Sequence, residues 1–261
     1  LNCIFKPKSI AIIGASTRQG SVGHAIFKNA IENGYEGKVF PVNIKGETLL
    51  GQQVYPSIGS LPQKVDLVVI VVKAPLVPQV VQECGQAGVG GLVIISAGFK
   101  EAGEAGEWMV DEILAYSRKY GMRIVGPNCL GFINPTLGVN VTFANRMALK
   151  GKIAFISQSG AICASILDWA KDQNVGFSHF VSIGSMIDIG FAELIDYFGM
   201  DPMTSSILIY MESITNARRF MSAARAFSRA KPIVILKSGK SEQVTQAAMS
   251  HTGSLAGNDA V

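Results

Sequence analysis

One histidine near the end of the sequence stands in a loop of small residues. His251 lies within the run AMSHTGSLAG (248–257), which would leave its imidazole exposed and the neighbouring backbone N–H groups free. Such a histidine can act as a general base, a metal ligand or a nucleophile that forms a covalent intermediate. We expect no metal, because no second His, Asp or Cys stands nearby at ligand spacing. A surface histidine without chemistry is the alternative, and we assign structural roles to His24 and His179.

A polar run at the end of a predicted strand could hold a phosphate for this histidine. The apolar run 153–157 ends in Ser-Gln-Ser-Gly and leads directly into a predicted helix over 161–171. The start of a helix offers free N–H groups and the positive end of its dipole, which together attract phosphate. We therefore assign phosphate binding to Ser157, Ser159 and Gly160.

An acidic residue follows another apolar run. Glu212 comes directly after 207–211, at the carboxyl end of a predicted strand, where α/β proteins build their sites. Its carboxylate could hydrogen-bond one ring nitrogen of His251 and so fix the tautomer in which the other nitrogen attacks. The pair predicts a nucleophilic histidine with an orienting carboxylate.

A second loop could bind phosphate near the beginning of the sequence. The strand predicted over Ser9–Ile13 is followed by Gly14, which would allow a tight turn, and a helix is predicted from Gly23. Backbone N–H groups between them, with the helix dipole behind, would hold a diphosphate. The loop residues that we assign to ligand binding are Ser16, Thr17, Arg18 and Gln19. Because the strict GxGxxG spacing is missing, an ordinary strand–helix turn is the alternative.

The charge after the next strand distinguishes between cofactors. Folds that bind NAD place an acidic residue about 20 residues after the loop, where this sequence has Asn43 and Lys45. A lysine would attract a phosphate on the ribose, which both NADP and coenzyme A carry. No residue set suited to hydride transfer stands out downstream, so we expect coenzyme A and disfavour an NAD(P)-dependent oxidoreductase. A solvated surface lysine is the alternative for Lys45.

The elements that must position these residues alternate along the chain. Short apolar runs are separated by amphipathic stretches at 23–32, 78–87 and 216–229, which predicts an α/β fold with parallel sheets and helices on both faces. Several runs are apolar throughout, as expected of strands buried on both faces. The predicted strands cover residues 9–13, 39–42, 67–72, 92–95, 123–125, 153–157, 178–183, 207–211 and 233–237.

The alternation breaks between Pro127 and Lys152. This stretch is rich in Gly, Pro and Asn and shows no clear period, which predicts a crossover between two domains, 1–148 and 149–261. The last residues, SHTGSLAGNDAV, look like the entry to a helix that is cut short. We therefore expect a fragment of a longer protein.

Composition excludes several classes of protein. Hydrophobic residues make up 48% and charged residues 16% of the 261 residues, which predicts a large core rather than disorder. The net charge of +4 is too small to indicate nucleic-acid binding. No apolar run approaches a membrane span and the beginning shows no secretory signal. The four cysteines are scattered along the sequence without paired spacing, which is typical of free thiols in a reducing compartment. We therefore expect a cytoplasmic location.

Three motifs together resemble one family. GPNCLGFINP (126–135), ISQSG (156–160) and SHTGSLAG (250–257) look like the α part of the NDP-forming acyl-CoA synthetases, including ADP-forming acetyl-CoA synthetase and, more distantly, succinyl-CoA synthetase. The resemblance extends over the whole chain. It implies a Rossmann-like CoA-binding domain followed by a flavodoxin-like domain that carries the active histidine, both with parallel sheets.

The resemblance also implies roles for individual residues. It makes His251 the phosphohistidine, Glu212 the carboxylate that stabilises it, and the helix start at 157–160 one holder of the phosphate. The loop 16–19 and Lys45 would hold the nucleotide end of CoA. Ile95, Ser96 and Ala97 would make further contacts with CoA. Asn128 and Cys129 would lie near its thiol and the acyl group.

The implied reaction needs parts that lie outside this sequence. Phosphate would attack an acyl-CoA thioester, His251 would take the phosphoryl group from the acyl phosphate, and the phosphohistidine would pass it to ADP or GDP. The nucleotide, with Mg, would bind on an ATP-grasp domain or β subunit, and the whole enzyme is expected to be an oligomer. The substrates would be an acyl-CoA and a small carboxylic acid.

One departure and one rival qualify the resemblance. Succinyl-CoA synthetase has a tyrosine where this sequence has Ala164, so acetate or another small or medium acid is expected rather than succinate. Similar two-domain segments are fused to GNAT-type acetyltransferase domains in bacterial protein lysine acetyltransferases. The alternative function is therefore a CoA-sensing regulatory segment with a fused GNAT domain.

Overall fold

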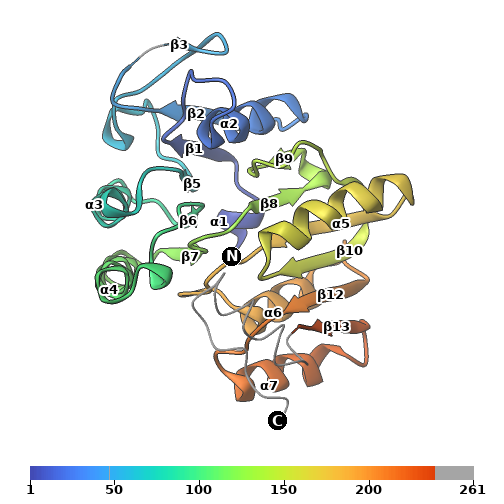
Figure 1. The fold of residues 1–261 in the computed structure, drawn as a ribbon. Helices are drawn as coiled ribbons and strands as arrows, with labels where there is room; N and C mark the ends of the chain where they lie inside the picture. The colour runs from blue at the N-terminus through green and yellow to red at the C-terminus, as the bar shows by residue number, and fades with distance from the viewer. Residues whose placement is uncertain (47, 239–261) are drawn as a thin grey trace.

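The first half of the chain forms a parallel sheet from short apolar strands (Figure 1). The computed structural model describes residues 1–46 and 48–238, and among these the strands lie in the order β2-β1-β5-β6-β7. The strands are buried almost throughout, which is why their sequences are apolar rather than alternating. They are β1 (Ser9–Ile13), β2 (Lys38–Val42), β5 (Leu67–Ile70), β6 (Gly91–Ile94) and β7 (Arg123–Val125).

Helices cover both faces of this sheet. α3 (Val77–Gln86) and α4 (Glu104–Tyr120) pack on one face, and α1 (Asn2–Phe5) and α2 (Val22–Glu32) pack on the other. Figure 1 shows α3 and α4 side by side along the outer edge of the molecule. The remaining elements of this half are the hairpin β3 (Thr48–Leu49) and β4 (Gln52–Gln53) and the 3-10 turns Ile58–Ser60, Ala74–Leu76 and Lys100–Ala102.

The second half forms a mixed sheet. Within the described residues its strands lie in the order β13-β12-β10-β11-β8-β9; the first four are parallel, whereas β8 pairs antiparallel with β11 and β9 antiparallel with β8. The expectation of a parallel second sheet was therefore wrong at this edge. The strands are β8 (Gly131–Asn134), β9 (Val139–Asn140), β10 (Leu149–Ser157), β11 (Gly176–Ser182), β12 (Ser206–Met211) and β13 (Ile233–Lys237).

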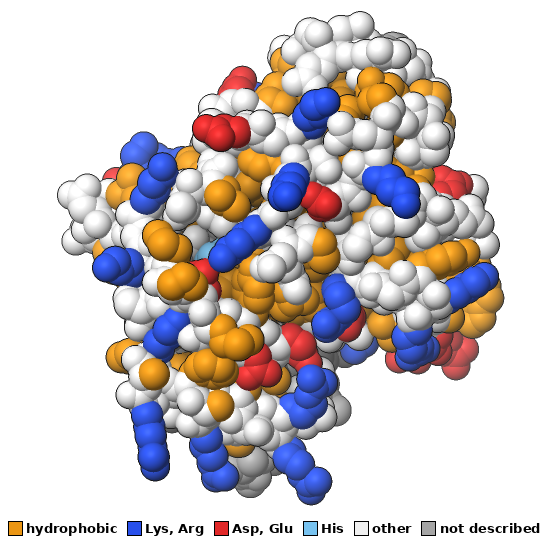
Figure 2. Space-filling model, turned by 180° about the vertical axis from the view of Figure 1, so that it is seen from behind, with side chains coloured by type: hydrophobic (Ala, Val, Ile, Leu, Met, Phe, Trp, Pro, Cys, Tyr) orange, Lys and Arg blue, Asp and Glu red, His pale blue; other side chains and the backbone are white. Residues whose placement is uncertain are grey.

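The helices of the second half are amphipathic and also cover both faces. α5 (Gly160–Asp172) packs on one face, and α6 (Phe191–Met200) and α7 (Ala217–Phe227) pack on the other. α7 buries Phe220 and Ala223 and leaves its arginines in solvent; Figure 2 shows Lys and Arg side chains standing out at the lower end of the molecule, where Figure 1 places α7. No helix among the described residues is both long and apolar enough to cross a membrane.

The segment without a period, 127–152, contains both antiparallel strands. β8 and β9 are joined by the 3-10 turn Pro135–Leu137, and they are too short for an alternating pattern to be recognised. The nine strands predicted from the sequence are all confirmed, with ends that differ by up to four residues. The domain boundary at 148/149 stays a prediction, although residues as early as Gly131 already belong to the second sheet.

A short segment of the second half lies along the edge of the first sheet. Residues 185–189 donate backbone hydrogen bonds to the carbonyls of residues 124–127, at 2.9–3.2 Å. The Asp188 carboxylate accepts hydrogen bonds from the backbone N–H of Ile124 (2.7 Å) and from Nε of Arg123 (2.9 Å). These contacts continue the hydrogen-bonding edge of β7, so the carboxyl ends of the two sheets are held facing each other.

A buried polar cluster connects β11 with the N-terminal segment. His179 is 2% exposed; its Nε2 accepts from Asn134 Nδ2 at 3.2 Å, and its Nδ1 lies 3.8 Å from the Asp201 carboxylate, too far for a hydrogen bond. Burial lowers the pKa of His179 to about 4. Burial alone would raise the pKa of Asp201, but hydrogen bonds from Lys6 (3.0 Å) and Thr204 (2.9 Å) hold it below its ordinary value.

We predict that His179 makes the fold sensitive to mild acid. Between pH 6.5 and 4 the unfolded chain binds a proton at this histidine that the folded chain does not, so the free energy of unfolding should fall by about 3 kcal/mol as the pH drops through this range. Asp201 contributes only at lower pH, below about 3.8. Urea unfolding at pH 7, 6, 5 and 4.5 measures the effect. His179→Asn should flatten the curve; an equal slope in both proteins would contradict the prediction.

Candidate functional site

A cavity of about 900 Å³ lies where the carboxyl ends of the two sheets meet. Its lining comes from segments that directly follow β5, β6, β7, β10, β12 and β13, as is usual for ligand sites in α/β folds. The volume falls in the range of small-molecule sites. We call this the shared cavity, because both halves of the chain supply its walls. Its main polar and site residues are Lys73, Ser96, Asn128, Gln158, Ser159, Tyr210 and Glu212.

The first half supplies the residues that the resemblance assigns to further CoA contacts and to the thiol end of CoA. Ile95, Ser96 and Ala97 follow β6 and all line the shared cavity. The Ser96 hydroxyl donates to the carbonyl of Val72, and the Ser96 carbonyl accepts from the backbone N–H of Asn128 at 2.9 Å. Asn128 has a φ of 54°, a left-handed conformation that asparagine tolerates. These hydrogen bonds hold the segment after β6 against the segments after β5 and β7.

Cys129 lines the same cavity but is not a nucleophile. Its side chain is 5% exposed and its Sγ–H donates to the carbonyl of Ile94 at 3.3 Å. Burial raises the pKa of this thiol to about 12, so it stays protonated at neutral pH. Because the thiolate is the reactive form, Cys129 can shape the wall of the cavity without taking part in acyl transfer.

The second half supplies a helix start. Ser159 is the N-cap of α5: its Oγ accepts from the backbone N–H of Ile162 at 3.3 Å, and it lines the shared cavity together with Gly160 and Ala161. The free N–H groups of this first turn therefore lie at the cavity. Ser157, also predicted to bind phosphate, is fully buried, donates to the Ser159 carbonyl (2.9 Å) and accepts from its N–H (3.1 Å). Its hydroxyl braces the turn and is not brought to the cavity.

Glu212 reaches the shared cavity from the end of β12. Its backbone N–H donates to Oε1 of Gln158 at 2.5 Å, and the N–H of Ser213 donates to the same oxygen at 2.9 Å. Tyr210 lies two residues earlier, on the same face of the strand, and also lines the cavity. The predicted carboxylate is thus brought to the helix start of α5. His251 lies outside the described residues.

Most of the residues predicted to hold the nucleotide end of CoA line a separate cavity of about 300 Å³. Ser16, Thr17 and Arg18 from the loop after β1 and Lys45 from the end of β2 face this space together. Asn43 links the loop after β1 to the segment after β2. Its Nδ2 donates to the Ala15 carbonyl at 2.7 Å, and its Oδ1 accepts from the Lys45 N–H at 3.1 Å. The cations Arg18 and Lys45 make this cavity suited to an anionic group.

Glycine at position 14 is required for the loop after β1. Its φ is +96°, and a Cβ at this position would lie 2.9 Å from the carbonyl oxygen of Val71. His24 Nδ1 lies 3.0 Å from the Ser16 carbonyl, which can only accept, so the neutral ring carries its proton on Nδ1. His24 therefore braces the loop, in keeping with its predicted structural role. Gln19 faces a neighbouring cavity, away from the other three predicted loop residues.

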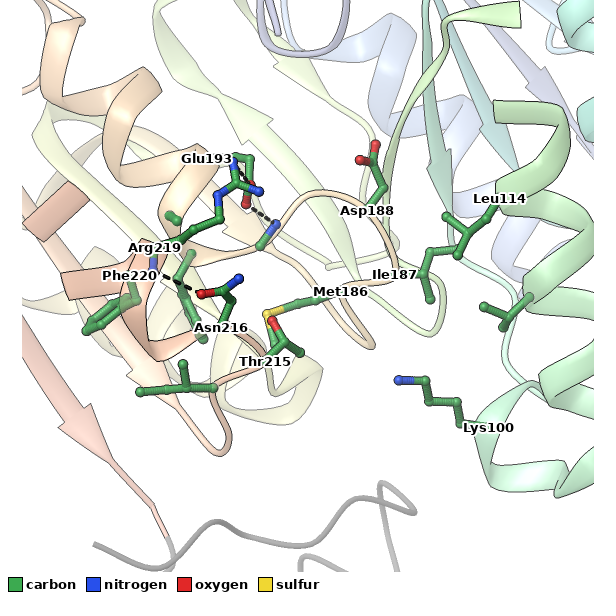
Figure 3. Close-up of a pocket in the computed structure, with 15 residues that line it drawn as sticks. Lys100, Leu114, Met186, Ile187, Asp188, Glu193, Thr215, Asn216, Arg219 and Phe220 are labelled. Atoms are coloured by element: carbon green, nitrogen blue, oxygen red, sulfur yellow. Dashed lines mark hydrogen bonds and ion pairs between the residues drawn. The ribbon is translucent and has the colours of Figure 1, made fainter. Parts of the chain in front are cut away.

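Another cavity, of about 340 Å³, lies between α4 and the starts of α6 and α7 (Figure 3). Its acids are already paired: Glu193 Oε1 binds Arg219 at 2.8 Å, and Asp188 binds Arg123. Lys100 points into the gap from the opposite wall. None of the predicted site residues within the described ranges lines this cavity. The described residues also contain no cluster of His, Cys, Asp and Glu that could hold a metal.

Several lining residues of the shared cavity were not predicted from the sequence. Lys73 lies three residues after the end of β5, and Gln158 stands inside the Ser-Gln-Ser-Gly run. Both positions follow strands, as the predicted site residues do. Tyr210 could have been found from the alternation that places it on the same face of β12 as Glu212. Phe143 belongs to the stretch without a period, and no sequence signal indicated it.

Comparisons with known proteins identify the family of this chain. The family model described as "CoA binding domain" matches residues 8–135, and the one described as "Succinyl-CoA ligase like flavodoxin domain" matches 150–261. The chain is 48% identical to the acetate–CoA ligase [ADP-forming] I subunit alpha of Pyrococcus furiosus, over 100% of this chain and 57% of that protein. It is 40% identical to the 4-hydroxybutyrate–CoA ligase [ADP-forming] of Nitrosopumilus maritimus, over 99% of this chain and 37% of that protein.

A solved structure gives the same result. The dinucleotide forming acetyl-coenzyme A synthetase 1 of Candidatus Korarchaeum cryptofilum, in complex with phosphate and ADP, matches with a TM-score of 0.93 and 39% identity, over 99% of this chain and 56% of that chain. The chain thus spans about half or less of the length of these relatives. They give no support to a GNAT-linked regulatory segment or to an oxidoreductase. The chain belongs to the NDP-forming acyl-CoA synthetase family, of which it contains the CoA-binding and the flavodoxin-like parts.

Proposed function

We propose that this chain is the CoA-binding and phosphohistidine module of an acid–CoA ligase that converts acyl-CoA, phosphate and a nucleoside diphosphate into the acid, CoA and a nucleoside triphosphate. One observation carries the proposal: the shared cavity joins the predicted thiol-end contacts of the first half to the start of α5 and Glu212 in the second. A thioester carbonyl, a phosphate and a carboxylate-oriented histidine could therefore react in one space. The relatives' names support the reaction class.

CoA would lie along the carboxyl edge of the first sheet. The sheet order β2-β1-β5-β6 puts Lys45 and the loop 16–18 at one side, and Ser96 at the other. The ribose phosphate would bind at Lys45, the diphosphate at the loop before α2, and the thiol end in the shared cavity. The direction follows from charge, because Arg18 and Lys45 are cationic whereas the walls of the shared cavity are mostly apolar.

The proposed reaction has three reversible steps. A phosphate oxygen attacks the thioester carbon and the CoA thiolate leaves, which gives an acyl phosphate. A ring nitrogen of His251 then attacks phosphorus, the carboxylate of the acid leaves, and the phosphohistidine forms. The phosphoryl group finally passes to ADP or GDP, which would bind with Mg on an ATP-grasp domain or β subunit. The first turn of α5 would hold the phosphoryl oxygens, and Glu212 would orient and stabilise the imidazole.

We predict that Lys45→Glu weakens the binding of CoA. A partly exposed ion pair is worth roughly 1 kcal/mol, and charge reversal adds repulsion, so the dissociation constant should rise at least about fivefold. Calorimetry with CoA and with dephospho-CoA locates the effect, since the loss should shrink when the 3′-phosphate is absent. Lys38→Glu, at the opposite end of the same strand, is the matched control. Equal CoA affinity in Lys45→Glu and wild type would remove Lys45 from the site.

We predict that the acyl end of the shared cavity favours acetate and small branched acids over succinate. Asn128 and Ala164 both line this cavity, and the small side chain at position 164 leaves room beside the start of α5. Ala164→Tyr should lower kcat/KM for branched acids about tenfold or more and change that for acetate less. A substrate panel on the full-length enzyme tests this, with Ala226→Tyr on the exposed face of α7 as the control. A clear preference of the wild type for succinate would contradict it.

We predict that His251 is transiently phosphorylated and that Glu212 supports this step. A carboxylate on one ring nitrogen raises the basicity of the other and stabilises the charge that develops, so Glu212→Gln should lower phosphorylation by about tenfold to a hundredfold while CoA binding persists. The measurement is incorporation of acid-labile, base-stable label from γ-labelled ATP in the full-length enzyme.

Two variants give this experiment its controls. His251→Ala should take up no label, and Glu107→Gln, which changes an exposed acid on α4, should take up as much as the wild type. Label that persists in His251→Ala, or a wild type that turns over substrate without any label, would rule out the phosphohistidine.

A further inference from the structure

We propose that Gln158 is a positioning residue that joins the phosphate-binding start of α5 to Glu212. This inference rests on the function proposed above, because it concerns how the same site is held together. Gln158 stands between Ser157, which braces the turn, and Ser159, which caps the helix. Its side chain does not run along this turn but crosses to the segment after β12.

The contacts of Gln158 fix one orientation of its amide. Oε1 accepts two consecutive backbone N–H groups, from Glu212 at 2.5 Å and from Ser213 at 2.9 Å, and only the oxygen of an amide can do this. Nε2 then faces Oγ of Ser213 and donates to it at 3.2 Å. The backbone N–H of Gln158 also donates to the carbonyl of Tyr210 at 3.2 Å. Four hydrogen bonds therefore tie one residue to the end of β12.

The segment 212–216 is held at both ends. Gln158 holds Glu212 and Ser213, and at the other end the side chain of Asn216 caps α7 by accepting from the N–H of Arg219 at 3.0 Å. A short segment with both ends fixed has few conformations, so the Glu212 side chain leaves the backbone from a defined point beside the start of α5. Gln158 would thus set the distance between the Glu212 carboxylate and the phosphoryl oxygens.

The hydrogen bonds at position 158 require a side chain with an acceptor oxygen. Leucine has a similar size but no acceptor, so Gln158→Leu would leave two part-buried N–H groups unpaired and release the segment. Glutamate keeps an oxygen for both N–H groups, and its second oxygen can accept from the Ser213 hydroxyl. Gln158→Glu should therefore keep the geometry, while its charge would raise the pKa of a neighbouring carboxyl group.

The experiment is a double-mutant cycle on the full-length enzyme, with incorporation of label into His251 and calorimetric binding of CoA as separate readouts. Gln158→Leu should slow labelling at least about tenfold and change the CoA dissociation constant less than about twofold. If it acts through Glu212, the same change in a Glu212→Gln background should slow labelling no more than about twofold further. Gln173→Leu, the same change at the other end of α5, should behave as wild type.

Each outcome decides between the inference and the proposed function. Wild-type labelling in Gln158→Leu, or losses that simply multiply in the double variant, would overturn the positioning role. A wild type that binds CoA but never labels His251 would overturn the proposed function instead. If Gln158→Leu fails to fold, Gln158→Glu is the deciding variant. The role is supported if His251 is labelled at a rate within a few-fold of wild type and the acidic side of the pH–rate profile moves to higher pH. An unchanged pH–rate profile contradicts it.

Discussion

The contact around Asp188 joins the carboxyl ends of the two sheets, in addition to an apolar core that both halves share. The Asp188 carboxylate accepts from the side chain of Arg123 and from the backbone of Ile124, and the residues around it continue the hydrogen-bonding edge of β7. A charge-assisted hydrogen bond of this kind is stronger and more directional than one between neutral groups. It aligns the carboxyl ends of the two sheets, so that loops from six strands line one cavity. Gly184 belongs to the same contact between the halves, because a Cβ at this position would lie 2.2 Å from the carbonyl oxygen of Pro127.

Within this frame the two cavities differ in chemistry. The smaller cavity beside the loop after β1 carries Arg18 and Lys45, whereas the shared cavity has mostly apolar walls interrupted by a few polar groups. That division suits a ligand with charge at one end and a reactive thioester at the other. Burial also keeps the nearby Cys129 thiol protonated, so an acyl group in the cavity meets no competing nucleophile from this residue.

Much of the site could be predicted because it follows strand ends. The apolar runs identified every strand of the first sheet, and the polar residues directly after them, such as Ser96 and Asn128, do lie at one cavity. Ser157 shows the limit of that reasoning: its residue type suggested phosphate, but its hydroxyl bonds its own turn. The strands β8 and β9 were not predicted because their sequences, GFIN and VN, lie in a stretch rich in Gly, Pro and Asn and form no continuous apolar run.

The sequence by itself determined nine of the strands, the helices at 23–32, 78–87, 161–171 and 216–229, the loops that follow β1 and β10, and the identity of the charged residues near them. These properties are local: they depend on hydrophobic period, on glycine at position 14 and on residue type. Tertiary structure decided which strand ends meet, that Gln19 faces a different cavity from Arg18, and that Gln158 bonds the backbone of Glu212. Those outcomes depend on contacts between residues far apart in the sequence, whose geometry is set only when the two sheets pack together.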